Sequence, residues 1–172
     1  MKQTRLNIVT KTEKYPIIIG SNLTSSVSKI FKSNSIDFDK CLIVVDKNVP
    51  KKFVSNIKKS LKNKSIFVLF FNASEKNKNI NSVNKILEVL LNKNFSRNDV
   101  LISLGGGITG DVSGFAASLF KRGLKFANIP TTLLAQVDSS IGGKTGVNSK
   151  YGKNLNWKFL SAFIGSLRYS IS

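Results

Sequence analysis

Short apolar runs alternate along the chain with longer segments in which apolar residues recur every three or four positions. The runs at residues 41–46 and 65–71 are continuously apolar, which is typical of strands covered on both faces of a parallel sheet. Residues 22–32, 50–61 and 79–93 instead show helical spacing. Strands that alternate with amphipathic helices predict an α/β domain with a mainly parallel sheet.

The two ends of this pattern predict further elements. Residues 6–10 and 15–20 are strand-like and separated by the polar sequence KTEK, which predicts an N-terminal hairpin. Residues 100–107 form a third buried strand that runs into glycines, residues 110–121 are helical, and residues 124–130 form another strand. In such sheets ligands bind beyond the carboxyl ends of the strands, so the candidate chemistry is expected there.

Composition limits the possible chemistry. The 172 residues are 41% hydrophobic, enough for one domain with a core, and include no histidine. A Ser-His-Asp triad, a Cys-His pair and a histidine-ligated metal are therefore excluded for this chain. Cys41 is the single cysteine, so no internal disulfide forms, and its apolar neighbours predict a buried small hydrophobe rather than a reactive thiol.

No stretch approaches the roughly 18 apolar residues that a membrane span needs, and the N-terminal sequence has no signal-like apolar core. We therefore expect no membrane association and a cytoplasmic location.

The chain is strongly basic, with 27 Lys and Arg against 9 Asp and Glu, a net charge of +18. The lysines are scattered through Lys/Asn/Ser-rich stretches of the first hundred residues, a composition that an AT-rich coding sequence supplies. There is no arginine-rich helix, zinc-finger spacing or aromatic RNA-binding signature. We expect no nucleic-acid partner, and a positive field favours an anionic small-molecule substrate.

Two features at strand ends are candidates for cofactor binding. The sequence GGGITGD at residues 105–111 follows a strand and opens a helix, so its backbone N–H groups could hold a diphosphate. Its spacing is not that of GxGxxG, and a tight strand-to-helix turn is the alternative. Asp46 ends a buried strand and could accept hydrogen bonds from ribose hydroxyls, although a helix N-cap is equally consistent there.

Residues 130–155 hold the densest set of candidate groups. Two threonines follow Pro130, and Asp138, Lys144, Lys153 and Asn154 lie among glycines and serines. Small residues allow close packing around a ligand, and lysines with an amide suit an oxygenated anion. Gly and Ser are also typical of turns, which explains the charged groups less well.

Residues 104–155, with GGGITGDVSGFAASLFKRG, IPTTLLAQVDSSIGGKTGVN and GKN, resemble the core signature of the 3-dehydroquinate synthase family. Weaker agreement extends back to the N-terminal hairpin. The resemblance implies a Rossmann-like NAD-binding N-terminal domain, a C-terminal helical metal-binding domain and a homodimer. It also implies two cofactors, NAD and a divalent metal, zinc or cobalt.

The implied activity is that of a carbon–oxygen lyase of the shikimate pathway, in aromatic amino acid biosynthesis. A sugar phosphate, 3-deoxy-D-arabino-heptulosonate 7-phosphate, becomes 3-dehydroquinate and phosphate through transient oxidation by NAD, phosphate elimination, re-reduction and aldol closure. Two alternatives stay open: another sugar-phosphate cyclase, and a non-catalytic nucleotide- or nucleic-acid-binding module.

The resemblance also implies roles for individual residues. Ser74 and Ala73 depart from the family pattern, at positions where a backbone contact would tolerate the change. The positions that match substrate contacts are Arg122, Asp138, Lys144 and Asn154. The positions that match cofactor contacts are Asp46, Asn48, Glu75, Lys78, Gly107, Ile108, Thr109, Gly110, Asp111, Thr131, Thr132, Lys144 and Lys153.

The resemblance stops after Leu155, where the family continues with a sequence like IGSFYQP and this chain has NWKFLSA. Codons for NWKFLSA, read one base later, can encode IGSFYQP, so we hypothesise a one-nucleotide shift near Leu155. The expected division is an NAD-binding domain at residues 1–155 and an out-of-frame tail at residues 156–172. The family's metal ligands lie beyond this point, so we expect this chain neither to bind the metal nor to turn over substrate.

Overall fold

The computed structural model of this chain describes residues 3–9, 14–136, 144–149, 152–159 and 162–167. In this part of the chain, seven strands form one sheet and two more form a separate hairpin. The order across the sheet is β1 (Thr4–Val9), β2 (Lys14–Gly20), β9 (Ala162–Leu167), β6 (Lys125–Pro130), β5 (Val100–Gly105), β3 (Lys40–Asp46) and β4 (Ser65–Phe71).

Within this sheet the described pairs from β2 across to β4 are all parallel, and β1 pairs with β2 in the antiparallel sense. The predictions of a mainly parallel sheet and of an N-terminal hairpin are therefore confirmed.

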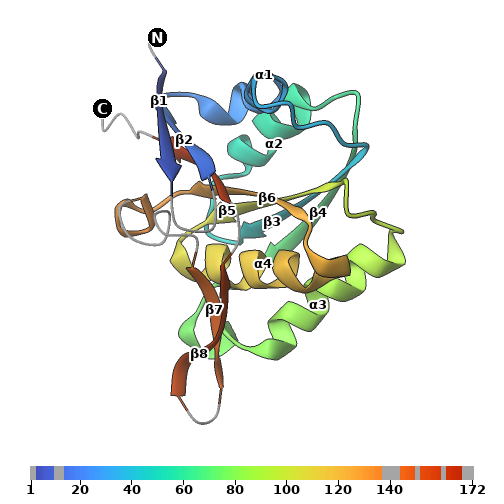
Figure 1. The fold of residues 1–172 in the computed structure, drawn as a ribbon, viewed down its shortest axis with the longest axis vertical. Coiled ribbons are helices and arrows are strands. Elements are labelled where there is room, and N and C mark those ends of the chain that lie inside the picture. The colour runs from blue at the N-terminus through green and yellow to red at the C-terminus, as the bar shows by residue number, and fades with distance from the viewer. Residues whose placement is uncertain (1–2, 10–13, 137–143, 150–151, 160–161, 168–172) are drawn as a thin grey trace.

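Helices cover both faces of the sheet (Figure 1). The helices α1 (Val27–Ser33) and α2 (Lys51–Ser60) lie on one face, and α3 (Ile80–Asn92) and α4 (Gly107–Leu119) lie on the other. Short 3-10 turns precede α1, precede α3 and follow α4: η1 (Leu23–Ser25), η2 (Glu75–Asn77) and η3 (Phe120–Arg122).

The alternation of side chains in the central strands builds two cores. Leu42 and Val44 of β3 pack with the α3 and α4 side, whereas Ile43 and Val45 pack with the α1 and α2 side. Because successive strand residues point to opposite faces, one apolar run supplies both cores. Cys41 is fully buried, as predicted, and burial raises the pKa of its thiol.

Several predicted elements differ in detail. The helix predicted over residues 22–32 is the 3-10 turn η1 followed by α1, which begins only at Val27. The run at residues 65–71 is less covered than predicted, since no residue of β4 is fully buried and Phe70 is 53% exposed; β4 is also an edge strand of the sheet. The helix predicted from residue 110 begins at Gly107, since Gly106 serves as its N-cap and the glycines belong to its first turn.

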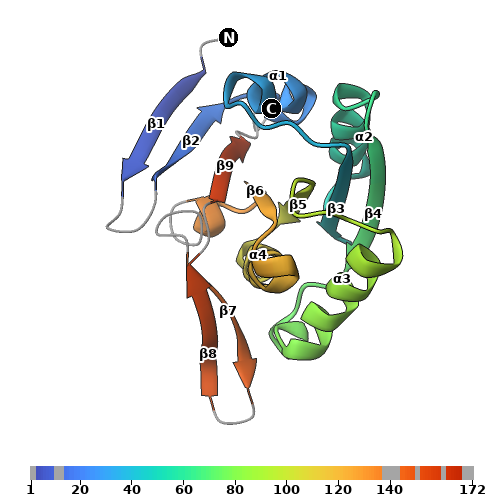
Figure 2. The same ribbon diagram turned by 45° about the vertical axis from the view of Figure 1, so that its right-hand side comes forward.

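The sequence did not predict the strands that follow Pro130. β7 (Lys144–Ser149) and β8 (Gly152–Phe159) form an antiparallel hairpin, and Figure 2 shows this hairpin extending past α4, away from the sheet. Gly114 of α4 lies so close to the Thr145 side chain that a Cβ at that position would overlap it. The hairpin is therefore packed directly on α4.

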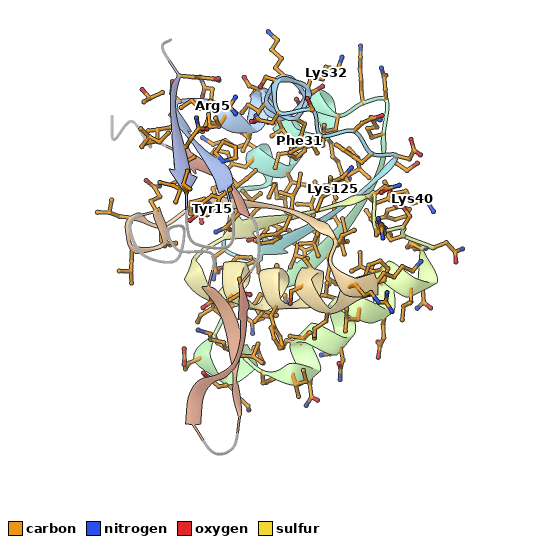
Figure 3. All side chains as sticks on the ribbon, viewed as in Figure 1. Arg5, Tyr15, Phe31, Lys32, Lys40 and Lys125 are labelled. Atoms are coloured by element: carbon orange, nitrogen blue, oxygen red, sulfur yellow. The ribbon has the colours of Figure 1, made fainter. Side chains whose placement is uncertain are left out.

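Several lysines donate to backbone carbonyls at the end of the sheet where the strands begin, among them Lys40 and Lys125, which Figure 3 labels. The Nζ of Lys40 donates to the carbonyls of Lys93 and Asn94, at 2.9 and 2.8 Å, at the end of α3. Lys121 Nζ donates to the Phe95 carbonyl at 2.8 Å. Part of the positive charge thus caps the carbonyl end of a helix and its following turn.

Among the described residues, no helix combines the length and the apolar character required to cross a membrane.

Candidate functional site

The strand order places a topological switch point, the position at which open α/β sheets have a crevice, at the carboxyl ends of β3 and β5. These two strands are neighbours, yet the helix after β3 (α2) and the helix after β5 (α4) cover opposite faces of the sheet. Such a topological switch point leaves a gap between the two connections, where ligands of open α/β sheets bind. Asp46 ends β3 and Gly105 ends β5, so both lie at this crevice.

The turn from β5 into α4 is built without side chains. A Cβ at Gly105 would lie 2.7 Å from Thr109 Oγ1 and 3.0 Å from the Cβ of Asp46. Gly106, the N-cap of α4, offers no side-chain cap, so the first N–H groups of the helix are left for another acceptor. The Oγ1 of Thr109 is buried and has no hydrogen-bond partner within the described structure. This cradle fits an anionic group such as a diphosphate.

Asp46 is half-buried at the rim of the cradle. Its Oδ1 accepts a hydrogen bond from the backbone N–H of Asn48 at 3.0 Å, and this bond closes a short turn. The N-cap of α2 is Pro50, so the alternative role of Asp46 as the cap of that helix is wrong. Asn48 itself is exposed beside it.

The two threonines after β6 lie next to the glycines. The N–H of Thr131 donates to the Gly105 carbonyl at 2.8 Å, which joins the two strand ends. A Cβ at Gly106 would lie 3.4 Å from the Cγ2 of Thr132. The Oγ1 of Thr132 accepts the Ala135 N–H at 3.2 Å, so this hydroxyl has a capping role as well.

A second group of predicted residues lies on the α3 side of the same helix turn. Lys78, which is 8% exposed, places its Nζ 2.6 Å from Oδ2 of Asp111 in the first turns of α4. Glu75 Oε1 accepts a hydrogen bond from Asn148 Nδ2 of β7 at 2.8 Å. The structure therefore brings Glu75, Lys78 and Asp111 together, with an additional residue, Asn148, that the sequence did not single out.

The remaining positions predicted for the cofactor are distributed along the helix turn and the hairpin. Gly107 and Ile108 open α4, and a Cβ at Gly110 would lie 3.2 Å from the amide of Asn128, which indicates a packing role for this glycine. The backbone of Lys153 lies in β8.

The predicted substrate contacts do not all lie near the crevice. Lys144 begins β7, Asn154 lies in β8, and Asp138 is outside the described residues. Arg122 follows the 13-residue helix α4 and precedes β6, so it lies at the other end of the sheet, where the strands begin. At 1.5 Å per residue that helix separates it from the glycine turn by about 18 Å.

Within the described residues, no three Asp, Glu or Cys side chains gather in a way that could hold a metal ion.

Comparison with known proteins identifies the chain's relatives. A family described as "3-dehydroquinate synthase N-terminal" matches residues 68–164, more than half of the chain. The chain belongs to the 3-dehydroquinate synthase family. It is 64% identical over 155 residues to the 3-dehydroquinate synthase of Pelagibacter ubique (strain HTCC1062), and the match covers 90% of this chain and 42% of that protein. It is 42% identical over 159 residues to that of Blochmanniella floridana, with 90% and 43% covered.

Solved structures of related cyclases have the same fold. A 2-deoxy-scyllo-inosose synthase superimposes with a TM-score of 0.86 at 27% identity, over 95% of this chain and 46% of that one. Another crystal structure of a 2-deoxy-scyllo-inosose synthase contains carbaglucose-6-phosphate, NAD+ and Co2+. The chain thus spans less than half the length of the relatives it matches, in sequence and in structure.

Proposed function

We propose that this part of a 3-dehydroquinate synthase binds NAD at the carboxyl ends of β3, β5 and β6. The observation that carries the proposal is the cradle of Gly105 and Gly106, which has Asp46 on one side and Thr132 on the other. The start of α4 would hold the diphosphate, and Asp46 would accept hydrogen bonds from a ribose. NAD supplies a reversible hydride acceptor when bound, and the residues around the cradle orient it.

We propose that Glu75, Lys78 and Asp111 complete the cofactor side of the site. Lys78 and Asp111 are paired and mostly buried, which fixes the α3 side of the glycine turn. Lys144, Lys153, Asn154 and Asp138 would serve the sugar phosphate and the cofactor from the segment after Thr132. A cationic and amide-bearing hairpin suits a phosphorylated, multiply hydroxylated substrate.

The proposed reaction of the longer proteins is conversion of 3-deoxy-D-arabino-heptulosonate 7-phosphate to 3-dehydroquinate and phosphate. The 64% identity to a 3-dehydroquinate synthase over 90% of the chain supports this choice. The competing proposal, a different sugar-phosphate cyclase, is supported by the 2-deoxy-scyllo-inosose synthase fold at 27% identity. Phosphate release by the longer protein, expressed from a gene that encodes it, distinguishes the two proposals. Release from the heptulosonate supports a 3-dehydroquinate synthase, and release from glucose 6-phosphate supports the other cyclase.

The cofactor part of the proposal is tested by isothermal titration of NAD into this chain. We expect saturable binding that the variant Asp46→Asn weakens at least about tenfold, because a ribose hydroxyl loses a charged acceptor. Asp39→Asn is the matched control, since Asp39 is an exposed carboxylate beside the amino end of β3. Equal affinities of the two variants and the wild type would contradict the assignment of Asp46.

For the assembly, we propose a cytoplasmic homodimer that uses zinc or cobalt, whose ligands the family resemblance assigns beyond residue 155. The crystal structure of a related cyclase with NAD+ and Co2+ supports the metal. Sedimentation velocity on this chain and on the longer protein measures the oligomeric state directly.

We also propose that residues 1–155 are the NAD-binding domain and that residues 156–172 come from a shifted reading frame. The departure of NWKFLSA from IGSFYQP supports this proposal. Resequencing the gene tests it: a coding sequence with no IGSFYQP one base away would overturn it.

A further inference from the structure

Asn148 of β7 joins two of the predicted cofactor residues. Its side-chain Nδ2 donates to Glu75 Oε1 at 2.8 Å, and its backbone N–H donates to the carbonyl of Lys78 at 2.8 Å. An isolated bridge also pairs Asn79 with Asn148. One residue of the hairpin is thus bonded to both ends of the turn that carries Glu75 and Lys78.

The connection continues into the start of α4. Lys78 pairs with Asp111 at 2.6 Å, and the two side chains are only 10% and 18% exposed. Charged hydrogen bonds of this kind are shorter and stronger than neutral ones, so the pair holds the η2 turn against α4. Asn148, Lys78 and Asp111 therefore link the hairpin to the helix turn that we assign to the diphosphate.

The hairpin strand on which Asn148 lies is firmly packed. Val147 is fully buried and Thr145 is 8% exposed, and Thr145 contacts Gly114 in the middle of α4. The same hairpin carries Lys144 at the start of β7, and Lys153 and Asn154 in β8. A displacement of Asn148 would therefore move these residues relative to the Glu75 turn.

We propose that Asn148 is a positioning residue that orients the Glu75 carboxylate and holds the hairpin in register with the cofactor side of the site. The inference rests on the proposed NAD site and adds a residue to it. An amide N–H that donates to a carboxylate oxygen sets the direction of the carboxylate. Through this bond the cofactor side and the hairpin form a single unit.

The test compares NAD titrations of the wild type, Asn148→Asp and the control Asn84→Asp. Asn84 is exposed on α3, so its replacement makes the same charge change without touching Glu75. We expect Asn148→Asp to weaken NAD binding about tenfold near neutral pH, because two carboxylates then face each other.

A second variant separates positioning from recognition. In Asn148→Asp with Glu75→Gln the hydrogen bond is restored with donor and acceptor exchanged. Hydrogen exchange of the β7 amides should return to the wild-type rate, while NAD affinity stays low because the Glu75 carboxylate is lost.

The outcomes distinguish the two proposals. A folded wild type that binds no NAD overturns the proposed function and this inference with it. A wild type that binds NAD, with Asn148→Asp equal to Asn84→Asp, overturns the inference alone.

Discussion

Gly105 is the position at which a single methyl group would disturb the cradle most. A Cβ there would come within 2.7 Å of Thr109 Oγ1 and 2.9 Å of Thr109 Cβ. We expect Gly105→Ala to lower the free energy of unfolding by about 1–3 kcal/mol, as overpacking does. Gly106→Ala is the control, since its Cβ would meet Thr132 at an ordinary 3.4 Å. Urea unfolding measures both, and an equal loss would contradict the packing argument.

Asp99 stabilises the end of the sheet at which β3 and β5 begin. Its carboxylate accepts the N–H groups of Ser96, Lys40 and Asp39 at 2.7, 2.9 and 3.3 Å. Burial raises the pKa of this carboxyl, but these hydrogen bonds outweigh it and hold the pKa below its usual range. Because the pKa is lowered in the folded state, the stabilisation is present above the unfolded value of about 3.9 and is lost as the pH falls through the folded one.

We therefore expect Asp99→Asn to cost about 1–3 kcal/mol of unfolding free energy near neutral pH, since one acceptor is replaced by a donor. The difference from the wild type should narrow below about pH 4. Urea unfolding from below about pH 4 to neutral pH measures this difference, with Asp39→Asn, a change at an exposed carboxylate, as the control. A difference in unfolding free energy that does not change with pH would contradict the stabilising role of the ionised Asp99 carboxylate.

Individual site residues were predictable where a strand end marked them. Asp46 and the glycines after β5 follow continuous apolar runs, and the structure places them at one crevice. Asn148 was not predictable in this way, because its bond to Glu75 joins residues 73 positions apart. Only the packing of the hairpin on α4 brings them together.

At the scale of elements, the contact between α4 and β7 positions the hairpin. A Cβ added at Gly114 would overlap the Cγ2 of Thr145 and would lie 3.3 Å from the Phe126 ring. We expect Gly114→Ala to lower the free energy of unfolding by about 1–3 kcal/mol and to speed hydrogen exchange in β7. Adding Thr145→Ser, which removes the methyl group, should recover part of the loss. Strictly additive effects of the two substitutions would refute direct contact.

Elements with strong apolar periodicity were predicted well, and those without it were not. β3 lies at the predicted residues because its five central positions are fully buried and needed an apolar run. β7 carries a glycine and polar residues and packs on a helix instead of joining the sheet, so no period marks it. The single apolar run of β4 did not reveal that this strand lies at an edge, because edge position depends on strand order.

At the scale of the whole molecule, the net charge of +18 opposes compaction. Raising the salt concentration from about 0.01 M to about 0.15 M shortens the screening length from about 30 Å to about 8 Å. We expect the Tm to rise by a few degrees over this range, because lysines that are not bonded to carbonyls repel one another less. A lower Tm at the higher salt concentration would show that ion pairs such as Lys78–Asp111 dominate instead.

The chain spans less than half the length of the relatives that it matches. The fold brings Asp46 and the glycines at residues 105–107 together at a topological switch point of the sheet. This arrangement is the basis of the assignment to NAD.

Hydrogen exchange with and without NAD reports both whether the cofactor binds and where it binds. We predict slower exchange of the amides at residues 105–111 and 131–135, and unchanged exchange at residues 120–125 on the opposite edge of the sheet. Unchanged exchange at residues 105–111 under saturating NAD, or protection confined to residues 120–125, would show that NAD does not bind at the start of α4.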